Sequence, residues 1–142
     1  MKERCFIDTH IFLFLFLEPE KLETKIDEIL GDYNNQFILS VESVREILML
    51  IKNGKINSRE LRTYADIKNL AESRHMEIRY IHESHLKKLS ALEPFPGHSD
   101  PADLMIIAQT ITENLPIISS DSKFKHYAGQ GLDLIYNNCS KR

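Results

Sequence analysis

The sequence predicts an α/β protein with a largely parallel sheet. Short apolar runs such as Cys5-Phe6-Ile7 and Pro116-Ile117-Ile118 are typical of buried strands. Helical patterns alternate with these runs along the chain, and no hairpin signal joins one strand to the next. Antiparallel neighbours can be joined by a tight hairpin, whereas parallel neighbours need a longer crossover, so this alternation favours a parallel sheet.

In the first half of the chain, caps and helix breakers mark the boundaries. Glu18-Pro19 follows the first apolar helix, Asn53-Gly54 suits the C-cap of a later one, and Ser58 suits the N-cap of a long helix that runs to Ser73. The expected elements, in order, are a strand at Arg4–Ile7, helices at Thr9–Leu17 and Glu20–Leu30, a strand at Phe37–Leu39, and helices at Val41–Lys52 and Ser58–Ser73.

The second half repeats the alternation. A loop is expected at Pro94-Phe95-Pro96-Gly97, because proline and glycine both interrupt regular structure. The expected elements, in order, are a strand at Glu77–Ile81, helices at Glu83–Leu92 and Pro101–Glu113, a strand at Pro116–Ser119, a short helical turn at Lys123–Tyr127 and a strand at Asp133–Tyr136.

Length and composition indicate one ordinary globular domain over residues 1–142. The chain is 42% hydrophobic and 27% charged, as in typical soluble domains. The apolar stretch Ile11–Leu17 is far shorter than the roughly 20 residues that span a membrane, so no membrane association is expected. The two cysteines, Cys5 and Cys139, form neither a disulfide framework nor a zinc signature, and a reducing cytoplasm fits best.

Charge is distributed unevenly along the chain. The net charge is −3, which argues against a strongly basic nucleic-acid clamp. Residues 52–88, however, carry nine basic and five acidic side chains, a balance of +4. A nuclease would use such a segment, beginning with Lys52, Lys55 and Arg59, to bind phosphates. A solvated helix surface would give the same pattern.

Two acidic residues directly follow predicted strands. Asp8 ends the first strand, and Asp121 follows Leu115-Pro116-Ile117-Ile118-Ser119-Ser120. The carboxyl ends of parallel strands form the edge at which open α/β sheets bind ligands. Both positions also suit helix N-caps, where a carboxylate accepts hydrogen bonds from unpaired backbone N–H groups. Capping and catalysis therefore both remain open for each residue.

Asp100 and Asp103 begin an apolar helix. Asp100 suits the N-cap, Pro101 suits the first helical position, and Asp103 stands where a capping-box acid belongs. The wheel of this helix has an apolar stripe, with Asp100 inside its angular range and Asp103 at its edge. Both carboxylates are therefore expected to point toward the sheet end of the helix.

Glu46 is the weakest acidic candidate on physical grounds. It falls almost opposite the apolar stripe of its own helix, so periodicity predicts that it faces solvent. Met49 and Leu50 also lie off that stripe, which leaves open a helix buried on both sides. The stripe consists of Val41, Val44, Ile47, Leu48 and Ile51.

If Asp8, Glu46, Asp103 and Asp121 converge, their charges repel one another. Two carboxylates about 4 Å apart cost roughly 4 kcal/mol at an effective dielectric constant near 20. A fold keeps such a cluster mainly when a hard divalent cation neutralises it, which indicates metal-dependent phosphoryl chemistry. The histidines His82 and His85 lack the HExxH spacing of a zinc protease and are expected on the surface.

Three segments together resemble the PIN-domain family, and in particular the VapC-type ribonuclease toxins of toxin–antitoxin pairs. The first, Phe6-Ile7-Asp8-Thr9-His10, is similar to the family's strand ending in Asp-Thr. The second runs from Leu39 to Ile47 and is followed by Lys52-Asn53-Gly54-Lys55. The third joins His98-Ser99-Asp100-Pro101-Ala102-Asp103 to Ser119-Ser120-Asp121-Ser122-Lys123-Phe124. The three segments span almost the whole chain in the family's order.

The resemblance implies a three-layer α/β/α sandwich around the sheet. It also implies that Mg²⁺ or Mn²⁺ is held in an acidic pocket by Asp8, Glu46, Asp103 and Asp121. The resemblance thus places Glu46 in the site, which periodicity does not. The supporting residues would be Thr9, Ser43, Asp100 and Ser119. Four positions depart from the family pattern, namely Arg45 for an aromatic residue, Ala102 for phenylalanine, Leu104 for arginine and Ser119 for threonine.

The leading hypothesis is a metal-dependent endoribonuclease that acts as the toxin of a toxin–antitoxin pair. A non-catalytic RNA-binding or regulatory module with a vestigial pocket is the alternative. A phosphatase with Asp8 as nucleophile fits less well, because His10 stands where that class places a second acid. The helix Ile11–Leu17 is apolar on every side, so self-association into a homodimer or a docked antitoxin is expected to cover it, although a fully buried core helix would look the same.

Overall fold

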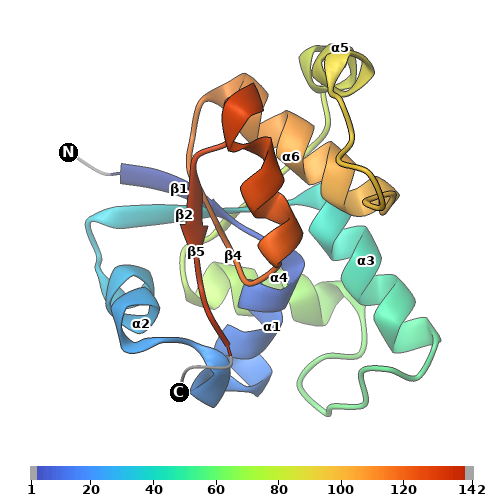
Figure 1. Ribbon diagram of the computed structural model, residues 1–142. Coiled ribbons are helices and arrows are strands. Elements are labelled where there is room, and N and C mark those ends of the chain that lie inside the picture. The colour runs from blue at the N-terminus through green and yellow to red at the C-terminus, as the bar shows by residue number, and fades with distance from the viewer. Residues whose placement is uncertain (1–2, 140–142) are drawn as a thin grey trace.

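The computed structural model describes residues 3–139 of the chain, so the predicted domain is described over that range and residues 1–2 and 140–142 lie outside it. Its centre is a five-stranded parallel sheet in the order β3-β2-β1-β4-β5 (Figure 1). The strands are β1 (Glu3–Ile7), β2 (Asn35–Ser40), β3 (Glu77–Arg79), β4 (Ile117–Ser119) and β5 (Leu134–Tyr136). The predicted parallel sheet is confirmed.

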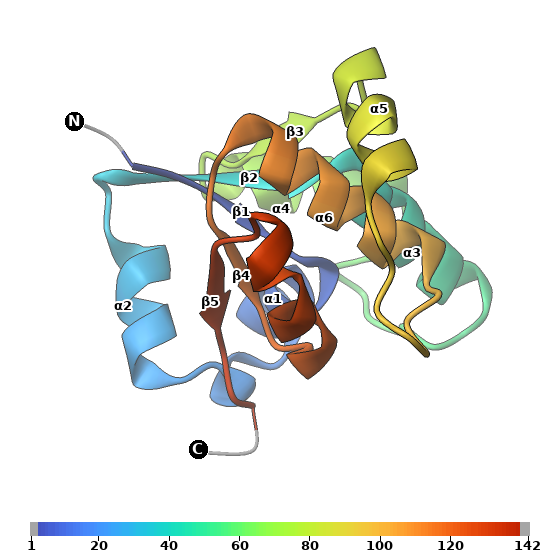
Figure 2. The same cartoon turned by 45° about the horizontal axis from the view of Figure 1, so that its top comes forward.

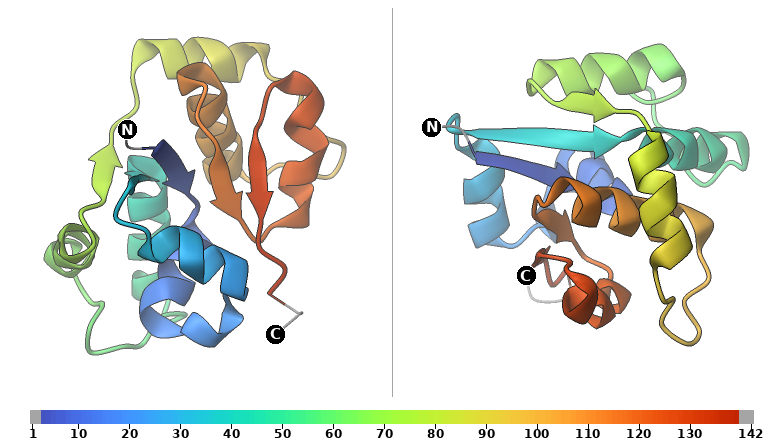
Figure 3. Two further views of the ribbon diagram at one scale, coloured as in Figure 1. Left: turned by 90° about the vertical axis from the view of Figure 1, so that its left-hand side faces the viewer. Right: turned by 90° about the horizontal axis from the view of Figure 1, so that it is seen from above.

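Helices cover both faces of this sheet, which confirms the three-layer arrangement (Figures 2 and 3). One face packs against α1 to α4, drawn in blue to green, and the other against α6 and a 3₁₀ helix, η2, drawn in orange to red, while α5 packs on α6. The helices are α1 (Thr9–Leu17), α2 (Thr24–Gly31), α3 (Val41–Lys52), α4 (Tyr64–Ser73), α5 (Glu83–Ala91) and α6 (Pro101–Glu113), with 3₁₀ helices η1 (Pro19–Lys21) and η2 (Ser122–Gln130).

Alternation along β1 shows how the sequence builds these layers. Cys5 and Ile7 belong to the apolar core beneath α1 to α4, whereas Phe6 belongs to the core beneath α6 and η2. Successive side chains of a strand point to opposite faces, so a strand buried on both faces reads as an unbroken apolar run. This burial explains the Cys5-Phe6-Ile7 signal of the sequence.

The strand order places a topological switch point between β1 and β4. The chain moves outward from β1 through β2 to β3, then crosses back to add β4 and β5 on the other side. Ile7 pairs in register with both Leu39 and Ile118, so the carboxyl ends of β1, β2 and β4 lie side by side. In open parallel sheets the crevice at such a switch point is the usual ligand site.

Two predicted helix boundaries were wrong. The helix expected from Ser58 begins only at Tyr64, because the Ser58 hydroxyl bonds Glu60 locally while Thr63 and Asp66 form a capping box. Residues 58–63 instead make a turn that contains an isolated bridge between Ser58 and Leu61.

The expected helix Glu20–Leu30 is divided into η1 and α2. The interruption is stabilised from the far end of the chain, where Asn137 accepts a hydrogen bond from the Glu23 amide and donates one to the Lys21 carbonyl. Backbone groups that a continuous helix would pair internally are thus paired through a tertiary contact. No local pattern in residues 20–30 signals that contact.

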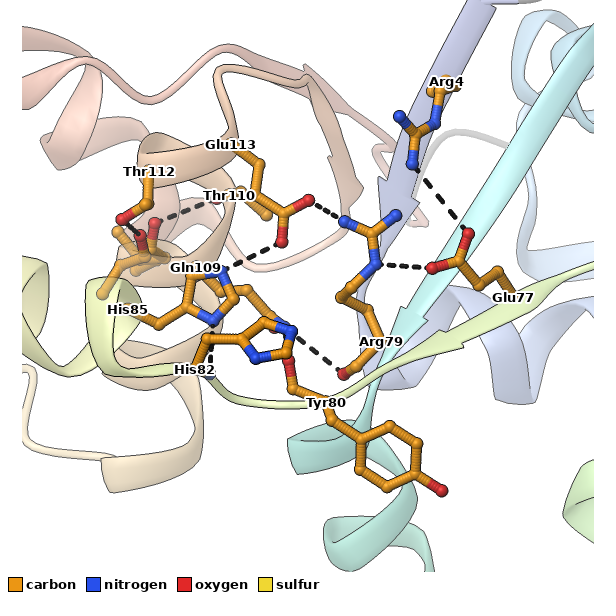
Figure 4. A network of polar contacts seen from close by, with 12 residues as sticks. Arg4, Glu77, Arg79, Tyr80, His82, His85, Gln109, Thr110, Thr112 and Glu113 are labelled. Carbon is orange, nitrogen blue, oxygen red and sulfur yellow. Dashed lines mark hydrogen bonds and ion pairs between the residues drawn. The ribbon is translucent and has the colours of Figure 1, made fainter.

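A polar network fixes β3 and α5 to α6 (Figure 4). The Arg79 guanidinium lies between Glu77 and Glu113 and pairs with both carboxylates, and Glu113 also accepts a hydrogen bond from His85 Nε2 at 3.0 Å. Gln109 donates to the backbone carbonyls that follow β3. His85 is 2% exposed, so its expected place on the surface was wrong, while His82 is exposed. Helix α5 is thereby held by buried polar contacts as well as by apolar packing.

Among the described residues, no helix is both long and apolar enough to cross a membrane. The apolar helix α1 is instead part of the core, with Ile11, Phe12, Leu13 and Phe14 buried. Its last turn is only half-buried and borders a groove of about 810 Å³. Outside α1, the apolar side chains that line this groove are Leu50 and Ile56.

Candidate metal centre

Asp8 occupies the end of β1 at the switch point. Its Oδ1 accepts a hydrogen bond from the Ile11 amide at 3.0 Å and so caps α1, while Oδ2 accepts one from the Ser119 hydroxyl at the end of β4. Asp8 therefore caps α1 and at the same time links the ends of β1 and β4 at the switch point. The side chain of Asp8 is only 6% exposed.

The surroundings of Asp8 oppose its ionisation. Its pKa is raised to about 6, mainly by burial and to a smaller extent by the charge of Glu46, against the lowering effect of the hydrogen bonds from Ser119 and Ile11. A buried carboxyl group with another acid nearby favours its neutral form unless a cation is present.

Glu46 lies inside the site, so the solvent-facing orientation predicted from periodicity was wrong. Its Oε1 accepts a hydrogen bond from the Thr9 hydroxyl, which itself lies 3.0 Å from the hydroxyl of buried Ser43. Helix α3 contacts both α1 and α6, so it is covered on more than one side. A single apolar stripe is a poor guide to the orientation of such a helix.

Asp100 and Asp103 stand together at the start of α6. Asp100 is exposed and caps the helix, since its Oδ1 accepts hydrogen bonds from the amides of Ala102 at 2.9 Å and Asp103 at 3.2 Å. Asp103 is less exposed and turns inward. Burial raises the pKa of Asp103 to about 6, and the charges of Asp100, Glu46 and Asp121 act in the same direction.

His98 is a site residue to which the sequence reasoning gave no role. It is 3% exposed, and its Nε2 lies 3.2 Å from Asp103 Oδ2. Its only sequence signal was its place two residues before Asp100 in the motif, because a loop residue has no periodicity to read.

Asp121 completes the edge after β4. Its carboxylate caps η2 by accepting a hydrogen bond from the Lys123 amide at 2.9 Å, and its own amide donates to Ser119 Oγ at 3.0 Å. Ser119 therefore connects Asp121 to Asp8 through one hydroxyl group. The carboxyl end of β4 positions both Ser119 and Asp121.

Ligand atoms from these residues converge in two overlapping groups. In each group the atoms lie within 4.8 Å of one another, and Asp103 belongs to both. The groups are Glu46, Asp100 and Asp103, and His98, Asp103 and Asp121. Asp8 belongs to neither and lies beside them through Ser119 and the charge of Glu46. A donor set made almost wholly of carboxylate oxygens fits a hard divalent cation such as Mg²⁺ or Mn²⁺.

Positive charge near the site is sparse. Arg45 forms an ion pair with Glu42 at 2.7 Å, and the negative charges of Glu46 and Asp100 are near enough to raise its pKa, although the bond to Glu42 is the larger cause. Lys52, the last residue of α3, is exposed, as are Lys55 and Arg59 beyond it, and Lys55 lines the groove beside α1. The structure leaves these three side chains free of ion pairs within the described residues.

A parallel α/β fold with an acidic cluster at its topological switch point defines a known class of protein. The chain belongs to the PIN-domain family, whose family model matches residues 5–130. The resemblance drawn from the motifs is thereby confirmed. No curated protein sequence matches the chain significantly.

Several solved structures with the same fold come from toxin–antitoxin systems. VapBC2 from Rickettsia felis, bound to a promoter DNA fragment, matches with 19% identity, a TM-score of 0.71 and coverage of 95% of this chain and 99% of that one. VapBC-5 from Mycobacterium tuberculosis matches with 19% identity, a TM-score of 0.62 and coverage of 94% and 98%. VapBC-1 from nontypeable Haemophilus influenzae matches with 16% identity, a TM-score of 0.66 and coverage of 97% and 99%. At these identities the likeness shows the fold.

Proposed function

We propose that this protein is a divalent-metal-dependent endoribonuclease and the toxin of a toxin–antitoxin pair. The observation that carries the proposal is the convergence of Glu46, Asp100, Asp103 and Asp121 beside buried Asp8 in a PIN fold. The raised pKa values of Asp8 and Asp103 support it, because burial and, to a smaller extent, neighbouring carboxylates disfavour their charged forms, and a bound cation would offset both effects. Hydrolysis of RNA phosphodiester bonds is the reaction that we assign to this site.

The proposal assigns one role to the four acidic side chains and another to the hydroxyl groups that contact them. Asp8, Glu46, Asp103 and Asp121 are both the catalytic residues and the ligands of Mg²⁺ or Mn²⁺. When bound, such an ion lowers the pKa of a water molecule and balances charge on the scissile phosphate. Ser119 and Thr9 hold the carboxylates of Asp8 and Glu46 through their hydroxyl groups, and Ser43 supports Thr9.

The remaining candidates act at the rim of the site. Asp100 stabilises the start of α6, which carries Asp103, by capping it. Lys52, Lys55 and Arg59 would bind phosphates of the RNA away from the cleaved bond, because their exposed ammonium and guanidinium groups have no competing ion pair within residues 3–139.

Purified protein is expected to cut RNA in Mn²⁺ and not in EDTA. We would incubate it with a panel of structured and single-stranded RNAs, alongside Asp8→Asn, which removes one metal-binding charge, and Asp27→Asn, which removes an exposed charge on α2. Cutting by the wild type and Asp27→Asn, but not by Asp8→Asn, would assign the activity to the acidic cluster and rule out a contaminant. RNA binding without cutting, unchanged in Asp8→Asn, would favour the non-catalytic module with a vestigial pocket.

We further propose that the protein works in the cytoplasm and binds an antitoxin, and that it forms a homodimer. The solved neighbours include several toxin–antitoxin complexes, and the groove between α1 and the segment after α3 offers half-buried apolar side chains to a partner. Light scattering is expected to show a dimer, and co-expression with the product of the adjacent gene is expected to yield a stable complex. A monomer at high concentration that does not bind that product would contradict both expectations.

A further inference from the structure

His98 lies between two side chains that belong to different parts of the fold. Its Nδ1 lies 2.7 Å from the hydroxyl of Tyr127 in η2, and its Nε2 lies 3.2 Å from Asp103 Oδ2 in α6. His98 is 3% exposed and Tyr127 is fully buried. Water therefore has little access to these hydrogen bonds, and the direction of each must follow from the protein groups.

The donors and acceptors of this chain determine where its protons lie. The Tyr127 oxygen accepts a hydrogen bond from the Phe95 amide at 3.0 Å, and within residues 3–139 His98 Nδ1 is the only acceptor bonded to this hydroxyl, so the tyrosine hydrogen donates to Nδ1. A neutral imidazole has one accepting nitrogen and one donating nitrogen. With Nδ1 as the acceptor, Nε2 carries the hydrogen and donates it to Asp103.

In this arrangement the two carboxylate oxygens of Asp103 differ in their hydrogen bonding. Oδ2 accepts the hydrogen from His98, while no other hydrogen bond reaches the carboxylate within residues 3–139. Oδ1 is therefore free to bind a ligand. A protonated Nε2 has no lone pair in the ring plane to offer a metal, even though it lies near Asp103 and Asp121.

We propose that His98 is a positioning residue, which holds Asp103 in its ligand orientation through Nε2–H and does not itself bind the metal. Tyr127 selects the required tautomer, and the loop that carries His98 is anchored to η2. The His98 amide donates to the Phe95 carbonyl at 2.8 Å, and the Phe95 ring stacks on His126 with centroids 3.5 Å apart. This inference rests on the proposed metal site, but it concerns how that site is built.

Three variants test the inference through metal binding, without RNA. His98→Asn keeps an oxygen near the Nδ1 position for Tyr127 but is too short to donate to Asp103. His98→Gln places its amide nitrogen near the Nε2 position and restores the donor. His75→Asn makes the same replacement at an exposed histidine outside the site. Calorimetry measures the Mn²⁺ affinity of each variant, and urea unfolding in EDTA checks that each is folded.

We expect His98→Asn to weaken Mn²⁺ binding about 10- to 100-fold, as loss of a hydrogen bond to a ligating carboxylate typically does. His98→Gln should recover most of the affinity, and His75→Asn should leave it unchanged. Unaltered Mn²⁺ affinity in folded His98→Asn would overturn the proposal. So would an equal loss in His98→Gln, because that variant keeps a donor.

Nitrogen NMR of the wild type gives a readout that does not depend on any variant. The His98 ring should show a hydrogen on Nε2 both in EDTA and in Mg²⁺. Loss of that hydrogen when Mg²⁺ is added would identify His98 as a direct ligand and overturn the proposal. Metal binding that depends on His98 in a protein that cuts no RNA would instead count against the proposed ribonuclease alone.

Discussion

Asp103→Asn is expected to lower metal-dependent RNA cleavage about a thousand-fold, whereas Asp100→Asn is expected to retain most of the activity. Both residues contribute to the group that includes Glu46, so distance alone does not distinguish their roles. Their hydrogen bonds distinguish them. Asp100 is exposed and uses Oδ1 to cap α6, while Asp103 is turned inward and its carboxylate is hydrogen-bonded only by His98 among the described residues.

The expected thousand-fold loss of cleavage follows from the role of the metal. Metal-ion catalysis contributes several kcal/mol of transition-state stabilisation, and about 1.4 kcal/mol corresponds to a factor of ten in rate. An asparagine at position 100 still caps the helix, since Asn and Asp are equally good N-cap residues. Single-turnover cleavage rates in saturating Mg²⁺ would measure both variants. Equal losses would make Asp100 a ligand as well, and full activity of Asp103→Asn would remove Asp103 from the site.

Asp8→Asn is expected to stabilise the metal-free protein at neutral pH while it abolishes cleavage. Burial raises the pKa of Asp8 in the folded protein to about 6, compared with 3.8 for the ordinary group. Between these two pH values the folded state binds more protons than the unfolded state. The free energy of unfolding contributed by Asp8 therefore falls as pH rises through this window, and it stays low above pH 6.

The difference between a pKa of about 6 in the folded protein and the ordinary value of 3.8 corresponds to about 3 kcal/mol. Asparagine avoids this penalty but loses the hydrogen bond that Ser119 donates, which contributes about 1 kcal/mol. We therefore expect Asp8→Asn to gain about 2 kcal/mol near pH 7.5 and to lose that advantage near pH 4. Urea unfolding in EDTA at both pH values would measure the difference. Asp27→Asn, which removes an exposed carboxylate instead, should show no such pH-dependent difference from the wild type.

A stability gain that is equal at both pH values would contradict this explanation, and so would a less stable Asp8→Asn protein at neutral pH. Mn²⁺ provides a complementary check. It should raise the unfolding temperature of the wild type, because binding to the folded state alone stabilises it, and it should have little effect on Asp8→Asn.

Local order in the sequence was sufficient to predict the sheet and two of the acids. Asp8 and Asp121 directly follow buried strands, and parallel strands bring their carboxyl ends to one edge, so these two positions were predictable without coordinates. The N-cap role of Asp100 was equally local, because Pro101 and the apolar stripe mark the start of α6. Patterns in neighbouring residues predict a structural feature correctly when that feature is determined by contacts between neighbouring residues.

Only the tertiary structure decided how Glu46 and His98 take part. Periodicity assumes that a helix buries one face, but α3 contacts both α1 and α6, and Thr9 from another element binds Glu46. His98 lies in a loop and gains its role from Tyr127, which is 29 residues further along the chain. The division of residues 20–30 by Asn137 has the same cause. Hydrogen bonds between distant segments satisfy polar groups that no local pattern can pair in advance.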